Sequence, residues 1–246
     1  MTQPQSIDPT AQQYEVHYPD SDGKPIGETD FHIAVIVYLR QVLRRFFRHS
    51  DDTYVAADML LYYEAGNPAA FRVPDTFVVK GVSTQDRRVF KIWEEKAAPC
   101  VVFEITSRST RLEDQGTKRA LYEMLGVREY FLFDPLEEYL TPRLQGLRLV
   151  DGAYAPMVPT PDGDLLSEEL GLRLMPEGKL LRLVDCATGE RLPTLDEAIE
   201  RAETEAERAE AEAGRAKAEA KRASTAETEV ARLREELSRL RRSNGT

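Results

Sequence analysis

The amino-acid sequence predicts an α/β fold, in which helices flank a mixed sheet and one long helix follows. Three observations predict it: an early helical repeat of apolar residues, several short β-branched or aromatic runs after it, and a final stretch rich in Ala, Glu and Arg. With 246 residues, 41% of them hydrophobic, the chain can form one sizeable core and a further element. We expect a loose leader at 1–27, one globular domain at 28–194 and a charged helix at 195–246.

The first expected element is an amphipathic helix. Residues 1–27 are rich in Pro, Asp, Gln and Gly and show no sustained periodicity. From Thr29, a suitable N-cap, the apolar residues recur at helical spacing. Arg44, Arg45 and Arg48 occupy the last turns, where positive charge matches the helix dipole. The apolar positions are Phe31, Ala34, Val35, Tyr38, Leu39, Val42, Leu43, Phe46 and Phe47.

The next segments predict a sheet with one helix inserted. Candidate strands cover Tyr54–Tyr63 in one or two pieces, Phe71–Val79 and Cys100–Thr106. A helix is expected at Leu112–Leu125, before Gly126, and a strand at Glu129–Asp134. The resulting order is helix, three strands, helix, strand, which favours a mixed sheet flanked by helices.

The stretch from Leu144 to Leu192 consists of short apolar runs separated by turn signals. Asp-Gly, Glu-Gly and Thr-Gly pairs interrupt it four times. We expect it to add hairpins at the edge of the same sheet.

The final stretch has the pattern of a coiled coil. Two apolar seams run along it, with a phase slip of the stammer kind after Ala223. Most seam residues are alanine, so pairing is expected to be strongest at the Val/Leu end. A lone solvated helix held by Glu and Arg pairs is the alternative. The seams are Leu195, Ala202, Ala209, Ala216, Ala223, Val230 and Leu237, and Ile199, Ala206, Ala213 and Ala220, continued by Ala226, Leu233 and Leu240.

The charge balance limits the expected contact with nucleic acid. The net charge is −10; the tail from Leu195 holds 13 acidic and 11 basic residues, which leaves 30 acidic and 22 basic residues before it. An acidic body argues against a protein that coats DNA, since such affinity comes from Lys and Arg neutralising phosphates. A small basic cleft remains compatible with this balance.

Other composition features point to a reducing, cytoplasmic location. No apolar run reaches the roughly 18 residues of a membrane span, and the first ten residues lack a signal pattern, so we expect no membrane association. Cys100 and Cys186 form no CxxC pair, and burial is the simple expectation for Cys100. The three histidines, His17, His32 and His49, do not form a zinc-type cluster with them.

Two carboxylates lie at the ends of apolar runs. Asp75 begins one run and Glu104 lies near the end of another, so neighbouring strands would allow one cation to bridge them. A charged Glu104 on a central strand costs several kcal/mol unless it is paired. A hard divalent cation such as Mg²⁺ is one partner. A salt bridge to Lys118 or Arg108 is the alternative.

The expected helix at Leu112–Leu125 presents Asp114, Lys118 and Tyr122 on one face, because they are four residues apart. A lysine there is suited to orient an attacking water and to stabilise charge on a phosphate. A surface ion pair between Asp114 and Lys118 and a core position for Tyr122 are the ordinary alternatives.

Taken in order, these motifs resemble the Uma-type family of restriction endonucleases in the PD-(D/E)XK nuclease superfamily. The resemblance runs from about Glu28 to about Leu192. It rests on Val73-Pro74-Asp75, Pro99 to Ser109, Asp114, Lys118, Tyr122, Gly126-Val127-Arg128-Glu129-Tyr130 and Asp134-Pro135.

The resemblance implies a restriction-endonuclease-like αβββαβ core, in which Asp75 and Glu104 hold Mg²⁺ or Mn²⁺. The superfamily places a lysine two residues after the glutamate, where this chain has Thr106. In similar families the next helix supplies the lysine, which points to Lys118. The family pattern also includes Glu28 and His32 as accessory ligands or substrate contacts; a dipole partner and a partly buried ring are their ordinary alternatives.

The segment after Glu104 offers hydroxyl groups and guanidinium groups. Arg108 and Arg111 would supply a local positive field near a bound phosphate. Ser109 or Thr110 is equally suited to cap the following helix.

These features favour a metal-dependent endonuclease that hydrolyses nucleic acid, with DNA as the expected substrate and a homo-oligomer formed through the coiled coil. The alternative is a catalytically silent nuclease fold that acts as an interaction module through its tail. A Cys or Ser hydrolase has little support, because no Gly-x-Ser-x-Gly elbow is present. No phosphate-binding P-loop or dinucleotide fingerprint is present either.

Overall fold

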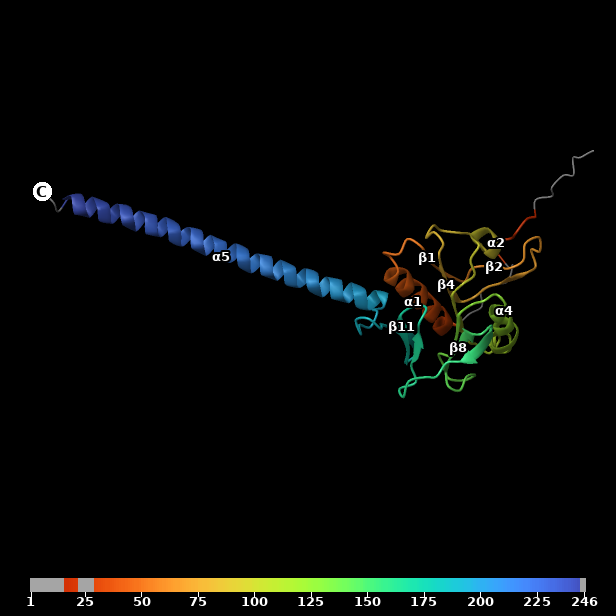
Figure 1. The fold of residues 1–246 in the computed structure, drawn as a ribbon. Helices are drawn as coiled ribbons and strands as arrows, with labels where there is room; N and C mark the ends of the chain where they lie inside the picture. The colour runs from red at the N-terminus through yellow and green to blue at the C-terminus, as the bar shows by residue number, and fades with distance from the viewer. Residues whose placement is uncertain (1–15, 22–28, 244–246) are drawn as a thin grey trace, which may run out of the picture. The chain divides into compact units, whose positions relative to one another are not determined.

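The computed structural model describes residues 16–21 and 29–243. The chain divides into two compact units, residues 1–192 and 193–246. Figure 1 shows the first as a mixed α/β unit and the second as a single long helix.

Helix α1 (Asp30–Phe46) is the amphipathic helix that the apolar spacing predicts. The Thr29 side chain accepts a hydrogen bond from the backbone N–H of His32, which confirms Thr29 as the N-cap. One face of α1 is buried, and Arg44 and Arg45 occupy the last turn. The helix therefore has an inner face fixed by packing and an outer face left to solvent.

A six-stranded mixed sheet forms the centre of the first unit. Along the chain, α1 and the first strands of this sheet give the predicted order of helix, three strands, helix and strand. β6 and β7 are parallel, and the helical segment between them makes the crossover. The strand order is β1 (Thr53–Ala57), β4 (Thr76–Lys80), β6 (Val101–Ile105), β7 (Glu129–Phe133), β8 (Leu144–Val150) and β9 (Ala153–Pro156).

The expected single strand at Phe71–Val79 is wrong. The chain breaks at Val73-Pro74-Asp75, because proline lacks the N–H that a ladder requires. β3 (Phe71–Arg72) instead joins β2 (Leu61–Tyr62) and β5 (Phe90–Lys91) in a small separate sheet, followed by the short helix α2 (Ile92–Glu95).

The hairpins expected after Leu144 are only partly at the edge of the main sheet. β8 and β9 extend that sheet, as expected. β10 (Leu165–Ser167), β11 (Leu172–Glu177) and β12 (Leu180–Asp185) form an antiparallel sheet of their own. Its inward leucines pack with α1, so this sheet completes the core on one side of the unit.

The main sheet is covered on both faces. Val101 and Phe103 of β6 pack with α1 and the β10–β12 sheet, whereas Val102 packs with Tyr122 of the crossover helix. All five residues of β6 and of β7 are buried, which fits their mostly apolar composition, with Glu104 and Glu129 as the exceptions. Figure 1 shows α1 and α4 on opposite sides of the strands.

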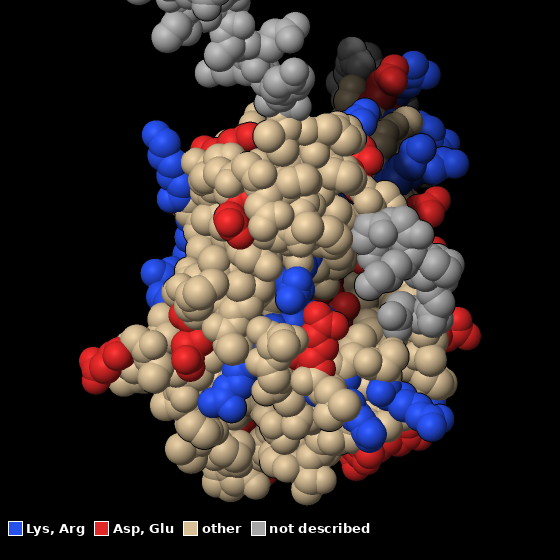
Figure 2. Space-filling model, turned by 90° about the vertical axis from the view of Figure 1, so that its right-hand side faces the viewer, with Lys and Arg blue, Asp and Glu red and all other residues tan. Residues whose placement is uncertain are grey.

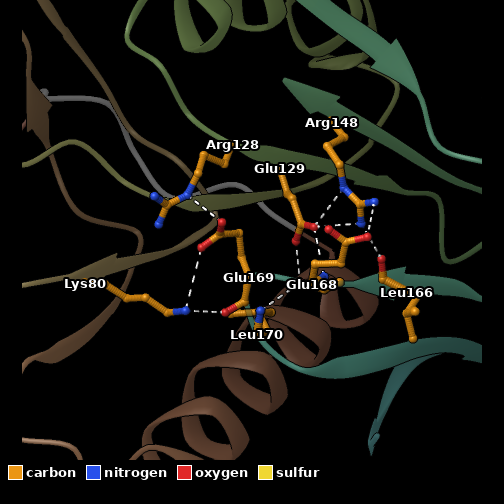
Figure 3. A network of polar contacts seen from close by, with 9 residues as sticks. Lys80, Arg128, Glu129, Arg148, Leu166, Glu168, Glu169 and Leu170 are labelled. Atoms are coloured by element: carbon orange, nitrogen blue, oxygen red, sulfur yellow. Dashed lines mark hydrogen bonds and ion pairs between the residues drawn. The ribbon is translucent and has the colours of Figure 1, made fainter. Parts of the chain in front are cut away.

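A polar network joins the start of β7 to the loop after β10 (Figure 3). Glu129 is buried and accepts hydrogen bonds from Arg148 (Nη2–Oε1 2.9 Å), from the backbone N–H of Glu168 (2.9 Å) and from the Ser167 hydroxyl. Nearby, Glu169 forms ion pairs with Lys80 and Arg128. Both carboxylates have partners, so we assign this network a structural role.

Helix α5 (Leu195–Ser243) makes up most of the second unit. Every residue from 199 to 240 is exposed. In the part of the chain that the structure describes, no helix combines the length and the apolar character that a bilayer crossing requires.

Candidate active site

Two neighbouring strands bring Asp75 and Glu104 together. β4 and β6 are antiparallel, with Thr76 opposite Phe103, so the residue before β4 lies beside the C-terminal end of β6. The backbone N–H of Ile105 donates to Asp75 Oδ2 at 2.6 Å. The two carboxylates therefore lie at the same end of two neighbouring inner strands.

The helical segment after β6 contains a π-helical turn. α3 (Arg111–Glu113) leads into η1 (Asp114–Lys118), which leads into α4 (Arg119–Met124). The sequence predicts a continuous helix over this range but gives no sign of the π turn. Such turns are rare in proteins, and those that occur are frequently found at functional sites. This one carries Asp114 and Lys118, and both side chains are buried.

Lys118 lies between two carboxylates. Its Nζ donates to Glu104 Oε2 at 2.8 Å and lies 3.0 Å from Asp114 Oδ1. The salt bridge considered for Glu104 is therefore present, with Lys118 as its partner. The surface ion pair expected for Asp114 and Lys118 is present but buried, so its surface position is wrong.

Tyr122 holds the other oxygen of Glu104. Its hydroxyl donates to Glu104 Oε1 at 2.8 Å, and its ring is fully buried. Tyr122 is therefore both a core residue and a contact of the site. Only 1% of Glu104 is exposed, so protein groups replace water around both of its oxygens.

The accessory candidates differ in position. His32 is buried, and its Nε2 lies 3.3 Å from Asp75 Oδ1, so α1 contributes to the site. Glu28 lies outside the described residues. Arg108 is exposed and makes no ion pair within the described residues. Thr110 is the N-cap residue of α3, but its side chain accepts a hydrogen bond from the Ser107 N–H and makes no capping hydrogen bond to the helix.

The site carries more negative than positive charge. Burial raises the pKa of Glu104 to about 8; Lys118 opposes this shift, while Asp75 and Asp114 add to it. Burial also raises the pKa of Asp114. Burial disfavours the charge on Lys118, but the three carboxylates outweigh it and raise the lysine pKa. One lysine therefore serves three carboxylates.

The residues fit a divalent cation held by two carboxylates and water. No group of three or more His, Cys, Asp or Glu side chains in the described ranges is arranged as a complete metal site. Mg²⁺ does not require one, because it is commonly held by one or two carboxylates and keeps several waters. Asp75 and Glu104 are the two carboxylates at the site for that role, and burial, together with the charges of Asp75 and Asp114, raises the pKa of Glu104.

Two supporting contacts have no signal in the sequence. The Ile105 N–H that fixes Asp75 is a backbone group, which any residue would supply. Tyr130 donates from its hydroxyl to the backbone oxygen of Asp114 at 2.9 Å, across the crossover. The first depends on the register of β4 against β6, and the second on the packing of the crossover helix against β7.

Comparison with known proteins gives a matching family and similar solved structures. The sequence pattern of the Uma2 family, described as "Putative restriction endonuclease", matches residues 5–178. A crystal structure of a "putative nuclease belonging to DUF820" from Anabaena variabilis is 15% identical, with 58% of this chain and 75% of that chain covered and a TM-score of 0.44. No curated protein matches the sequence.

Proposed function

This chain belongs to the Uma2 family, and we propose that it is a divalent-metal-dependent endonuclease that hydrolyses phosphodiester bonds in DNA. The observation that carries the proposal is the cluster of charged side chains at one end of strands β4 and β6. In it Asp75, Glu104 and Lys118 come from three separate segments of the chain.

Asp75 and Glu104 are the proposed cation ligands. The Ile105 N–H and His32 orient the Asp75 carboxylate, and Tyr122 orients Glu104. Burial raises the pKa of Tyr122 well above its ordinary value, so its hydroxyl keeps the proton that it donates. A bound divalent cation would lower the pKa of a water and offset charge on the scissile phosphate.

Lys118 is the proposed electrostatic group. Its raised pKa keeps it protonated at neutral pH, so it acts as a hydrogen-bond donor and not as a general base. When Glu104 turns to a cation, the Lys118 ammonium group loses that contact and is able to donate to a water or a phosphate oxygen. Asp114, 3.0 Å away, keeps it at the site.

The experiment is nicking of supercoiled plasmid in Mg²⁺ and in Mn²⁺. We expect wild type to nick DNA and Asp75→Asn, Glu104→Gln and Lys118→Met each to lose at least 100-fold in rate, the order of effect of removing one charge-stabilising group. Asp162→Asn is the matched control, because Asp162 is exposed, lies in the loop before β10 and should keep full activity. Nicking that survives in the Asp75→Asn, Glu104→Gln double variant would overturn the assignment.

For the tail we propose homo-oligomerisation through the apolar seam of α5. Five residues near its end, Ala226, Val230, Leu233, Leu237 and Leu240, are spaced alternately by four and three. All five are exposed. Apolar residues in this repeat bury their surface when a second helix packs against them.

Light scattering on the full chain tests the tail proposal. Val230→Glu with Leu237→Glu places charge in the seam and should reduce the mass to that of a monomer. Ala231→Glu, on the adjacent outer face, is the control and should leave the mass unchanged. A monomeric wild type would contradict pairing.

A further inference from the structure

The outer face of α1 carries a line of exposed arginines. Arg40 and Arg44 are four residues apart on one side of α1, Arg48 lies in the turn just after its last residue, Phe46, and all three are exposed. Val35, Leu39 and Val42 occupy the buried side. The arginines therefore point away from the core.

This line is a local excess of positive charge on an acidic unit. Residues 31–50 contain four arginines and no Asp or Glu. Figure 2 shows one face of the molecule, on which lysines and arginines are interspersed with carboxylates over a largely uncharged surface. In the described part of the chain, Arg40 and Arg48 make no ion pair, and Arg44 pairs only with the exposed Asp86 at 3.4 Å. Exposed pairs of this kind are weak, so the arginines remain available to a ligand.

A depression lies at the end of the line. It has a volume of about 200 Å³, and Arg44, Arg48, Ser50, Thr53 and Thr84 contribute to its lining. Guanidinium groups are strong donors to phosphate oxygens, whereas the Ser50 hydroxyl already donates to Asp52 at 2.8 Å. Asp51 is the acidic residue in the lining.

The helix dipole does not account for the whole line. Positive charge near the C-terminus is stabilising within the last turn only, which covers Arg44 and Arg45. Arg40 lies before that turn.

Helix α1 also reaches the candidate site, where His32 lies on its buried face, whereas the arginines lie on its exposed side. The other end of α1 places His32 3.3 Å from Asp75. At 1.5 Å per residue, Arg40 and Arg44 lie about 12 and 18 Å from His32 along the helix, or roughly four and five base pairs. We propose that Arg40, Arg44 and Arg48 bind the sugar–phosphate backbone of the strand cleaved at Asp75 and Glu104. The proposal rests on the proposed function for its substrate.

Binding measured in EDTA separates this proposal from cleavage. The probe is a labelled 30-base-pair DNA duplex, with an RNA duplex of the same sequence as the second arm, titrated over a range of salt concentrations. The test protein is the α1 triple variant, which combines Arg40→Gln, Arg44→Gln and Arg48→Gln. We expect the slope of the logarithm of the binding constant against the logarithm of salt concentration to become shallower by about 2 to 3, and affinity at 0.1 M salt to fall on the order of 100-fold. A loss with either duplex supports the phosphate-backbone contact, and the arm that shows it identifies the sugar.

The control removes the same charge from the tail. The control triple variant combines Arg201→Gln, Arg208→Gln and Arg215→Gln. These arginines lie outside both apolar seams of α5, and the variant should keep the wild-type salt slope. Unchanged urea stability of the α1 triple variant would exclude a folding defect. Equal slopes for wild type and the α1 variant, or no binding by wild type, would overturn the proposal. Loss of binding in a protein that never nicks would support the α1 contact and count against the nuclease alone.

Discussion

Glu104→Gln should change how the stability of the protein depends on pH. The substitution keeps the size of the side chain and removes its titration. The ordinary pKa of 4.5 applies in the unfolded chain, and the folded value is about 8. Between these values the folded protein holds a proton that the unfolded chain has lost. The free energy of unfolding of wild type must therefore fall as pH rises through this window.

The magnitude follows from the width of the window. One proton contributes a slope of about 1.4 kcal/mol per pH unit, so the window of about 3.5 units amounts to at most about 5 kcal/mol. Below pH 4.5 and above pH 8 this group adds no slope. Glu104→Gln should lack this dependence, so its curve should diverge upward from wild type between pH 5 and 8.

Urea unfolding at pH 5, 6.5 and 8 in EDTA measures the effect. Trp93 is the single tryptophan and lies in α2 of the first unit, so its fluorescence reports on this unit. Glu129→Gln is the control, a same-size change at a buried carboxylate whose partners include Arg148; it should lower stability by losing charge-assisted hydrogen bonds. Parallel pH curves for wild type and Glu104→Gln would refute the reasoning.

Three further predictions concern stability. Lys118→Met should lower the free energy of unfolding by about 3–5 kcal/mol, because two buried carboxylates lose their cation. The control Lys91→Met removes an ion pair with the exposed Glu94 and should cost under about 1 kcal/mol. Equal urea midpoints for the two variants would contradict this difference. Tyr122→Phe should cost about 1–3 kcal/mol, measured in the same assay, because Glu104 loses a buried hydrogen-bond donor; no loss would mean that the bond is not made. Gly146→Ala should cost about 1–3 kcal/mol, because the added Cβ would lie 2.6 Å from Met157 Sδ. At Gly116 an added Cβ has no neighbour within 4 Å, so Gly116→Ala should raise helix stability by about 0.5–1 kcal/mol. Thermal melting of both variants tests the contrast.

Periodicity and strand composition were sufficient to predict the core elements. The spacing of apolar residues predicted α1, and the apolar run Val101–Phe103 predicted β6 as a central strand, whereas Glu129–Asp134 was predicted only as a strand. Turn signals located the hairpins after Leu144. They could not show that β10–β12 form a sheet of their own, because that depends on packing against α1.

The candidate site was predictable as far as its residues but not its contacts. The positions of Asp75 and Glu104 at the ends of apolar runs indicated neighbouring strands, and the register confirms that they are neighbours. The π turn that contains the buried Lys118 has no signal in the spacing of the apolar residues. An i,i+4 pair looks the same in sequence whether it is exposed or buried.

The most direct test of the account is calorimetric titration of Mn²⁺ and Mg²⁺ into wild type and Asp75→Asn at pH 7 and pH 9, in buffers of different ionisation enthalpy. We predict that wild type binds the cation and, with a Glu104 pKa of about 8, releases about 0.9 proton at pH 7 and about 0.1 at pH 9, while Asp75→Asn does not bind. Absence of binding by wild type, or equal binding by Asp75→Asn, would contradict a metal site at Asp75 and Glu104.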